Sequence, residues 1–233
     1  MQYISPNAVT CQAAIFDLDG TLIDSLEDIA DSANAMLAGY GFPSHDVDLY
    51  RLMVGNGSRK LIERCLPEES RKDAAFIDEA LARYKQEYEV RLTTKTRPYA
   101  GILTMLARLR DMQVPMAVCT NKHQSAADAI TAALFPAGTF REVIGDAEGL
   151  PRKPDPAKVL KLAENMGVKP EKVAYFGDTS VDMDTAKNAG AVALGVTWGF
   201  RSREELEQHG ARFVLDMPAE LFTKVAFEKA GKE

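Results

Sequence analysis

The sequence predicts an α/β fold in which a doubly wound, Rossmann-like parallel sheet forms the core and an all-helical domain is inserted after the first strand. Three observations lead to this fold class. Residues 13–19 are a short apolar run ending in acidic residues, residues 26–91 show helical periodicity without a convincing strand, and strands alternate with helices from residue 96 onward. Such alternation predicts right-handed crossovers and helices on both faces of the sheet.

The first run, AAIFDLD, precedes Gly20 and Thr21 and is typical of a buried strand that delivers polar residues to a loop. Apolar side chains then recur at steps of three and four in residues 26–40. Further helical patterns cover residues 47–53, 59–65 and 68–91. We therefore expect a discontinuous core domain of residues 1–22 and 96–233, and a helical cap domain of residues 23–95.

In the C-terminal part of the chain, the apolar pattern changes between helical and strand periodicity at short intervals. We expect helices at residues 101–111, 124–134, 156–166, 181–189 and 203–209. We expect strands at residues 114–119, 140–144, 173–176, 191–196 and 213–215. A last helix is expected from Pro218, and the tail AFEKAGKE, residues 226–233, is expected to form a fraying amphipathic helix.

Composition excludes several classes of function. The 28 Lys and Arg residues against 34 Asp and Glu residues give a net charge of −6, which argues against a nucleic-acid or anionic-membrane partner. No run of 18 apolar residues occurs, and the first residues lack the pattern of a secretory signal. The three widely spaced cysteines fit free thiols in a reducing compartment. We expect a cytoplasmic protein, and the sequence does not decide between a monomer and a homodimer.

Four polar clusters follow the predicted strands. They contain Asp17, Leu18 and Asp19; Thr120 and Asn121; Lys153; and Asp178 and Asp182. Because the carboxyl ends of parallel strands share one edge of a sheet, we expect the four clusters to meet there. Gathered carboxylates repel one another unless a cation joins them, and oxygen ligands of this kind suit Mg²⁺. The sequence therefore predicts a magnesium site at this edge.

Phosphoryl transfer is the chemistry that fits these residue types. A carboxylate can attack phosphorus when the charges on both partners are offset, and Mg²⁺ supplies that offset. A second carboxylate two residues further on can act as general acid and then as general base. Lysine and hydroxyl donors neutralise charge on the phosphoryl oxygens.

The stretches FDLDGTLIDS, TNK, RKPDP and YFGDTSVDMDTA resemble, in order and spacing, the four motifs of the haloacid dehalogenase superfamily of phosphatases. The GNG at residues 55–57 and the fourth motif look closest to its bacterial phosphoglycolate phosphatase branch. The resemblance implies that Asp17 is the nucleophile, that Asp19 is the acid/base and gives its carbonyl to Mg²⁺, and that Asp178 is the remaining protein ligand. It also implies that Asp182 orients metal water or Lys153, and that Lys153 stabilises charge on the nucleophile. Thr120, Asn121 and the backbone amides of Leu18 and Asp19 would bind the phosphoryl group.

Plainer readings stand beside these roles. The DLDGT stretch can be a strand-end turn, Thr120-Asn121 an ordinary helix cap, and Asp178 and Asp182 turn and cap residues. A non-catalytic phospho-ligand binding protein, a signalling receiver domain and a dehalogenase are alternatives of other classes. The retention of both Asp17 and Asp19 argues against each of them, and the chain is about twice as long as a receiver.

Substrate choice depends on the inserted helices. Asn56 and Gly57 offer a backbone amide loop before a predicted helix that carries Lys60, and this arrangement could clamp the carboxylate of a small acid. The alternative is a plain helix–turn–helix with solvated basic residues. By resemblance, 2-phosphoglycolate is the first candidate substrate. A sugar phosphate, pyrophosphate or nucleoside monophosphate would require the same core residues, so the partner is predicted only as a small phosphorylated metabolite.

Overall fold

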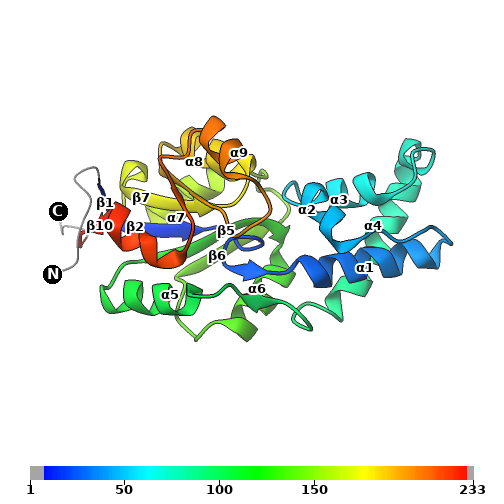
Figure 1. Ribbon diagram of the computed structural model, residues 1–233, viewed down its shortest axis with the longest axis horizontal. Helices are drawn as coiled ribbons and strands as arrows, with labels where there is room; N and C mark the ends of the chain where they lie inside the picture. The colour runs from blue at the N-terminus through cyan, green and yellow to red at the C-terminus, as the bar shows by residue number, and fades with distance from the viewer. Residues whose placement is uncertain (1–7, 230–233) are drawn as a thin grey trace.

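A six-stranded parallel sheet organises residues 8–229, which the computed structural model describes (Figure 1). In spatial order its strands are β6 (Glu142–Asp146), β5 (Met116–His123), β2 (Ala13–Phe16), β7 (Val173–Gly177), β8 (Val192–Val196) and β9 (Phe213–Leu215). From β2 the chain moves outward to β5 and β6, returns to β7 on the other side, and moves outward again to β9. Ligands bind at such a reversal, beyond the carboxyl ends of the strands. The predicted α/β fold class is confirmed.

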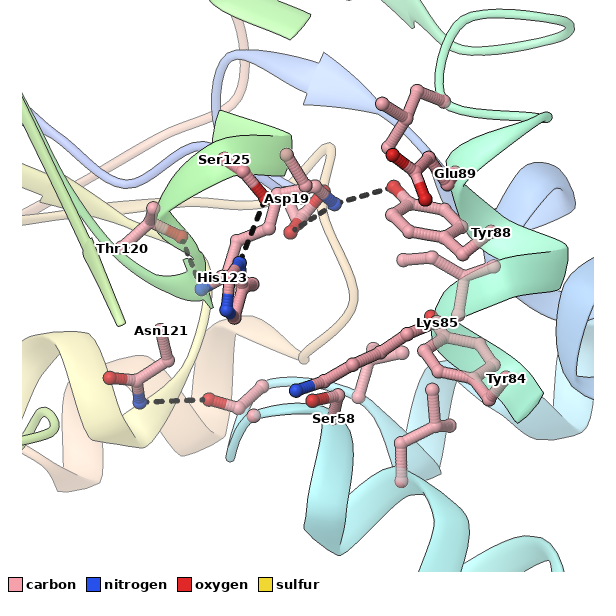
Figure 2. Close-up of a pocket in the computed structure, with 18 of the residues that line it drawn as sticks. Asp19, Ser58, Tyr84, Lys85, Tyr88, Glu89, Thr120, Asn121, His123 and Ser125 are labelled. Atoms are coloured by element: carbon pink, nitrogen blue, oxygen red, sulfur yellow. Dashed lines mark hydrogen bonds and ion pairs between the residues drawn. The ribbon is translucent and has the colours of Figure 1, made fainter. Parts of the chain in front are cut away.

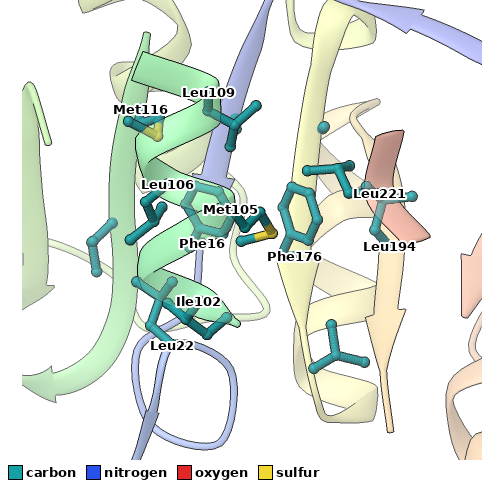
Figure 3. Packing of buried hydrophobic residues seen from close by; sticks show 14 of the residues in the cluster. Phe16, Leu22, Ile102, Met105, Leu106, Leu109, Met116, Phe176, Leu194 and Leu221 are labelled. Atoms are coloured by element: carbon teal, nitrogen blue, oxygen red, sulfur yellow. The ribbon is translucent and has the colours of Figure 1, made fainter. Parts of the chain in front are cut away.

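Alternate residues of the central strands face opposite layers of helices. Ala14 and Phe16 contact one hydrophobic cluster, while Ala13 and Ile15 contact another. The first cluster packs against α5 (Ile102–Asp111), α6 (Gln124–Leu134) and the short α10 (Leu221–Lys224). The second packs against α7 (Ala157–Asn165), α8 (Ser180–Ala189) and α9 (Arg203–Gln208). In the first cluster Phe16 stacks on Phe176 with ring centroids 4.6 Å apart. Figure 3 shows both rings among the apolar side chains of this cluster. Every residue of β2 is buried, so its sequence is apolar throughout instead of alternating.

The inserted segment forms helices with a separate hydrophobic cluster at one end of the molecule (Figure 1). These helices are α1 (Leu26–Gly39), α2 (Val47–Met53), α3 (Ser58–Cys65) and α4 (Ala74–Glu89), with a 3-10 turn at Ser70–Lys72. We call this segment the helical block. A short antiparallel ribbon of β3 (Ile23–Asp24) and β4 (Arg97–Pro98) joins it to the sheet. The division of the chain into two domains stays a prediction, and its predicted boundaries fall beside this ribbon.

A buried carboxylate holds the entry and exit of the helical block together. Asp28, in the first turn of α1, accepts hydrogen bonds from the backbone amides of Lys95 (2.9 Å) and Thr96 (2.7 Å) and from the Thr96 hydroxyl (2.6 Å). Asp28 is 1% exposed, so these donors replace the water that an ionised carboxylate would otherwise need. The two connections between the block and the sheet are therefore fixed side by side.

The structure corrects three sequence expectations. The first strand ends at Phe16, and β5 continues to His123, so Thr120 and Asn121 lie on the strand and not after it. The helix expected from Pro218 is a 3-10 turn followed by α10, and Val225–Phe227 then form β10, which pairs in parallel with β1 (Val9–Cys11). The prediction of a helical tail is therefore wrong for these residues, because pairing with β1 satisfies their backbone hydrogen-bonding groups. Residues 230–233 of that tail, and residues 1–7, in which the sequence shows no secretory-signal pattern, lie outside the described residues. Within residues 8–229, no helix is long and apolar enough to cross a membrane.

Candidate active site

Three carboxylates meet at the carboxyl ends of β2 and β7. Asp17 directly follows β2, Asp178 directly follows β7, and Asp182 lies in the first turn of α8. One oxygen of each lies within 4.8 Å of the other two. The Asp17 amide donates to the carbonyl of Phe176 over 2.9 Å, so the two strands hold these residues in register. The structure thus brings together the first and fourth polar clusters that the sequence predicts.

Burial makes two of these carboxylates, Asp17 and Asp178, costly to ionise. Burial, together with the negative charge of Asp182, raises the pKa of Asp17 to about 6 even though Lys153 opposes the shift. Burial and the neighbouring charges of Asp182 and Asp17 raise the pKa of Asp178 well above its ordinary value. The Oδ1 atom of Asp17 is buried, and the Lys153 ammonium lies 2.9 Å from it. A buried, oxygen-rich cluster of three carboxylates, whose charge Lys153 offsets only in part, fits a small divalent cation such as Mg²⁺.

Two glycines allow the backbone to approach Asp178 closely. A Cβ atom at Gly20 would lie 2.3 Å from Asp178 Oδ2, and one at Gly199 would lie 2.3 Å from Asp178 Cβ. Gly20 also has a φ of +81°, a conformation that side chains disfavour. Thr21 and the Phe200 amide donate to the two oxygens of Asp178 over 3.1 and 2.9 Å. These contacts leave Asp178 one orientation, toward Asp17.

Lys153 is buried between two of the carboxylates. Its Nζ lies 2.9 Å from Asp17 Oδ1 and 2.7 Å from Asp182 Oδ1. Burial disfavours the charge of Lys153, but the attraction of Asp17 and Asp182 outweighs this and holds the pKa of Lys153 above its ordinary value. The other oxygen of Asp182 accepts from the hydroxyl of Thr179 (2.7 Å) and from its amide (3.2 Å), which caps α8. Asp182 therefore both caps a helix and orients Lys153.

The predicted phosphate-binding residues lie beside this cluster, with their polar groups already partly engaged. The Asn121 side chain accepts from the Lys153 amide over 2.9 Å and donates to the Lys153 carbonyl over 3.2 Å. The Thr120 hydroxyl is buried and accepts from the Lys122 amide over 3.2 Å. Leu18 is buried in the turn after Asp17. Through these bonds Asn121 fixes the backbone that carries Lys153, a contact that the sequence pattern did not predict.

Asp19 is held by a group that sequence reasoning passed over. Lys122 Nζ lies 2.8 and 3.0 Å from the two carboxylate oxygens of Asp19, and the Ser25 hydroxyl donates to Oδ1 over 2.6 Å. Lys122 also donates to the hydroxyl of Tyr88 on α4. The feature of the sequence that could have identified Lys122 as a site residue is its place in the TNK stretch. Its partners, however, are 103 and 34 residues away along the chain, so local pattern did not identify them.

A cavity of about 380 Å³ lies between the helical block and the strand ends (Figure 2). From the sheet side it is lined by Asp17, Asp19, Thr120, Asn121, Lys122 and His123. From the block it is lined by residues that include Gly55, Gly57, Ser58, Tyr84, Lys85, Tyr88 and Glu89. In Figure 2 the Lys85 side chain extends from α4 into this space. The cavity therefore joins the nucleophile and acid/base candidates to side chains of the block.

The loop between α2 and α3 contacts the sheet, but two of the three predicted selectivity residues point away from the cavity. Gly57 lines it, whereas the Asn56 side chain accepts from Arg64 Nη2 over 2.7 Å, and the exposed Lys60 pairs with Glu63. The structure does not bring Asn56 and Lys60 to the site, because local contacts within the block hold both side chains. Lys85 lines the cavity instead, and the sequence reasoning passed over it.

Comparisons with known proteins agree with this geometry. Residues 14–196 match the family model described as haloacid dehalogenase-like hydrolase. The chain is 34% identical over 194 residues to a phosphoglycolate phosphatase of Mesorhizobium japonicum, covering 83% of this chain and 86% of the relative. It is 32% identical to a phosphoglycolate phosphatase of Rhodospirillum rubrum, covering 94% and 93%. A solved haloacid dehalogenase-like hydrolase of Streptococcus pneumoniae superposes with a TM-score of 0.81 at 25% identity, covering 91% of this chain and 96% of that one. The chain therefore belongs to the haloacid dehalogenase-like hydrolase family.

Proposed function

We propose that this protein is a Mg²⁺-dependent phosphomonoester hydrolase that acts through an aspartyl-phosphate at Asp17, with 2-phosphoglycolate as the first candidate substrate. The observation that carries the proposal is the position of Asp17. Its buried carboxylate lines the cavity, contacts the Lys153 ammonium over 2.9 Å, and lies beside two further carboxylates. The similarity to the phosphoglycolate phosphatases of Mesorhizobium japonicum and Rhodospirillum rubrum supports both the reaction and the substrate.

In the first step an Asp17 oxygen bonds to phosphorus while the bond from phosphorus to the leaving oxygen breaks, and protonated Asp19 gives its proton to that oxygen. The alcohol then departs. In the second step the Asp19 carboxylate takes a proton from water, and the water oxygen bonds to phosphorus as the bond to Asp17 breaks. Inorganic phosphate leaves, and Asp17 and protonated Asp19 are restored. Lys153 stabilises the negative charge on Asp17 and on the phosphoryl oxygens in both steps, and the Thr120 hydroxyl offers a hydrogen bond to those oxygens.

Asp17, Asp178 and the backbone carbonyl of Asp19 would hold the Mg²⁺, with Asp182 behind them as the partner of Lys153. When bound, Mg²⁺ neutralises the charge shared by nucleophile and phosphoryl group. The close approach of the Asp17, Asp178 and Asp182 oxygens and the raised pKa values of Asp17 and Asp178 are the features that support this assignment. We place the reaction in the cytoplasm, on a small phosphorylated metabolite.

The cavity favours one second substrate class. Its volume of about 380 Å³ lies in the range that holds ligands larger than glycolate. The aromatic side chains of Tyr84 and Tyr88 form part of its wall. A sugar phosphate, whose ring can pack on such a wall, is therefore the second candidate. Pyrophosphate or a nucleoside monophosphate would use the same core residues.

The test is phosphate release by purified protein with Mg²⁺ across a panel of phosphomonoesters, with Asp17→Asn as control. We expect hydrolysis that requires Mg²⁺ and is abolished by Asp17→Asn. Highest kcat/KM on 2-phosphoglycolate supports the first substrate, and highest kcat/KM on a sugar phosphate supports the second. No hydrolysis by the wild type, or full activity of Asp17→Asn, would overturn the mechanism.

A further inference from the structure

We propose that Lys122 is a positioning residue that aligns the acid/base Asp19 and ties it to the helical block through Tyr88. The proposal rests on the proposed function, since it concerns the group that protonates the leaving oxygen. Nothing in the sequence pattern or in the names of the relatives assigns this role to either residue.

The contacts are close and shielded from water. Lys122 Nζ lies 2.8 and 3.0 Å from the Asp19 oxygens, and the side chains of Lys122 and Asp19 are 6% and 20% exposed. The same Nζ donates to the Tyr88 hydroxyl and lies 4.6 Å from the centroid of the Tyr88 ring. Tyr88 itself is buried, at 6% exposed. One ammonium therefore joins a carboxylate of the sheet edge to a side chain of the block.

Asp19, Lys122 and Tyr88 come from three different elements, so the position of the helical block affects how Asp19 is held. Asp19 lies in the turn after β2, Lys122 near the end of β5, and Tyr88 in the last turns of α4. Asp19 and Tyr88 lie close together in Figure 2, and the Lys122 ammonium bonds to both of them. Because Lys122 engages both Asp19 oxygens while Ser25 engages one, the carboxylate plane is set from two sides. Asp19 is aligned when α4 is seated over the strand ends, and a block that moves away removes one of the groups that hold Lys122.

Alignment of this kind matters only when the leaving group needs a proton. A misplacement of about 1 Å at a catalytic group can cost on the order of 10²-fold in rate. An alkyl phosphate releases a strongly basic alkoxide and depends on the acid, whereas p-nitrophenyl phosphate releases a stable phenolate and does not. A pair that serves only folding or substrate binding would affect both substrates equally. The ratio of the two kcat/KM values therefore separates a positioning role from a structural one.

The experiment uses the full chain with saturating Mg²⁺ and compares 2-phosphoglycolate, or the best alkyl phosphate of the panel, with p-nitrophenyl phosphate. The kcat/KM value covers the steps through departure of the leaving group, so the later hydrolysis of the aspartyl-phosphate does not enter it. We expect Lys122→Met to lower kcat/KM on the alkyl ester about 10²-fold, the low end of what a positioned acid contributes, and on the aryl ester by only about 3-fold. We expect Tyr88→Phe, which keeps the ring, to shift the ratio the same way by a smaller factor.

Two further variants keep the test decisive. Lys122→Arg retains the charge and should recover part of the alkyl activity. Tyr40→Phe removes a hydroxyl from the same block, one that donates to the exposed Glu79 over 3.0 Å, and should leave the ratio unchanged. Circular dichroism melting curves show which variants are folded. If Lys122→Met does not fold, the ratio of kcat/KM values measured for Tyr88→Phe tests the proposal in its place. Equal losses on both esters in the folded variants would overturn this proposal while leaving the phosphatase assignment in place. No hydrolysis of either ester by the wild type would overturn the phosphatase assignment, and activity that survives Asp17→Asn would overturn the role of Asp17 as nucleophile.

Discussion

Exchange of Lys153 for methionine tests how the charges of the site are balanced. The variant Lys153→Met keeps an unbranched side chain of similar length and removes the ammonium that lies 2.9 Å from Asp17 Oδ1 and 2.7 Å from Asp182 Oδ1. Both carboxylates are buried, so water cannot take the place of the lost partner. Removing one partner of a buried ion pair costs about 3–5 kcal/mol in the free energy of unfolding.

The loss should depend on pH, with a sign set by the raised pKa of Asp17. Even with Lys153 present, that pKa stands at about 6 against an ordinary value of 3.8, a difference that lowers the free energy of unfolding at neutral pH by about 3 kcal/mol relative to pH values below 4. The native state therefore binds more protons than the unfolded state in this window. The free energy of unfolding falls as pH rises from about 4 to about 6 and stays low above it. Without Lys153 the pKa of Asp17 rises further, so the variant should lose more stability at pH 7.5 than at pH 5.

Urea unfolding with EDTA present measures this loss. Fluorescence of the single tryptophan, Trp198, and circular dichroism report the transition at both pH values. The matched control is Lys60→Met, because the Lys60 side chain is 56% exposed and pairs with Glu63 at the surface. It should change stability by less than about 1 kcal/mol. A loss for Lys153→Met below about 1 kcal/mol at pH 7.5, or an equal loss at pH 5, would refute the reasoning.

Three other perturbations follow from the same structure. Saturating Mg²⁺ should raise the Tm at pH 7.5 by several degrees, and Asp178→Asn should abolish the rise in differential scanning fluorimetry; an unchanged rise would place the metal elsewhere. Asp28→Asn weakens the bonds to the amides of Lys95 and Thr96 and should lower the free energy of unfolding in urea by about 1.5–3 kcal/mol. An unchanged midpoint would show that these bonds do not stabilise the connection between the block and the sheet. Lys85→Met should raise KM for 2-phosphoglycolate more than for a phosphate with an uncharged leaving group, whereas Lys60→Met should not. The opposite result would indicate that the loop before Lys60 selects the substrate.

The local sequence pattern was sufficient to predict the elements whose formation depends on backbone propensity and on the burial of one face. The apolar run at Ala13–Phe16 marks a strand buried on both faces, and the spacing of apolar residues from residue 26 marks helices that must cover a core. The short pairing of β1 with β10 left no such signal. Its strands have three residues each and depend on one another across the whole length of the chain.

The order of strands and polar residues along the chain is enough to predict which residues arrive at the edge of the sheet that carries the candidate site. Asp17, Asp178 and Lys153 follow or lie near parallel strand ends, and all such ends share one side of the sheet, so topology alone gathers them. Which side chains then contact one another depends on the packing of segments that lie far apart in the sequence. Lys122 joins Asp19 to Tyr88 because α4 packs over the end of β5, and packing between distant segments leaves no periodic trace in either one.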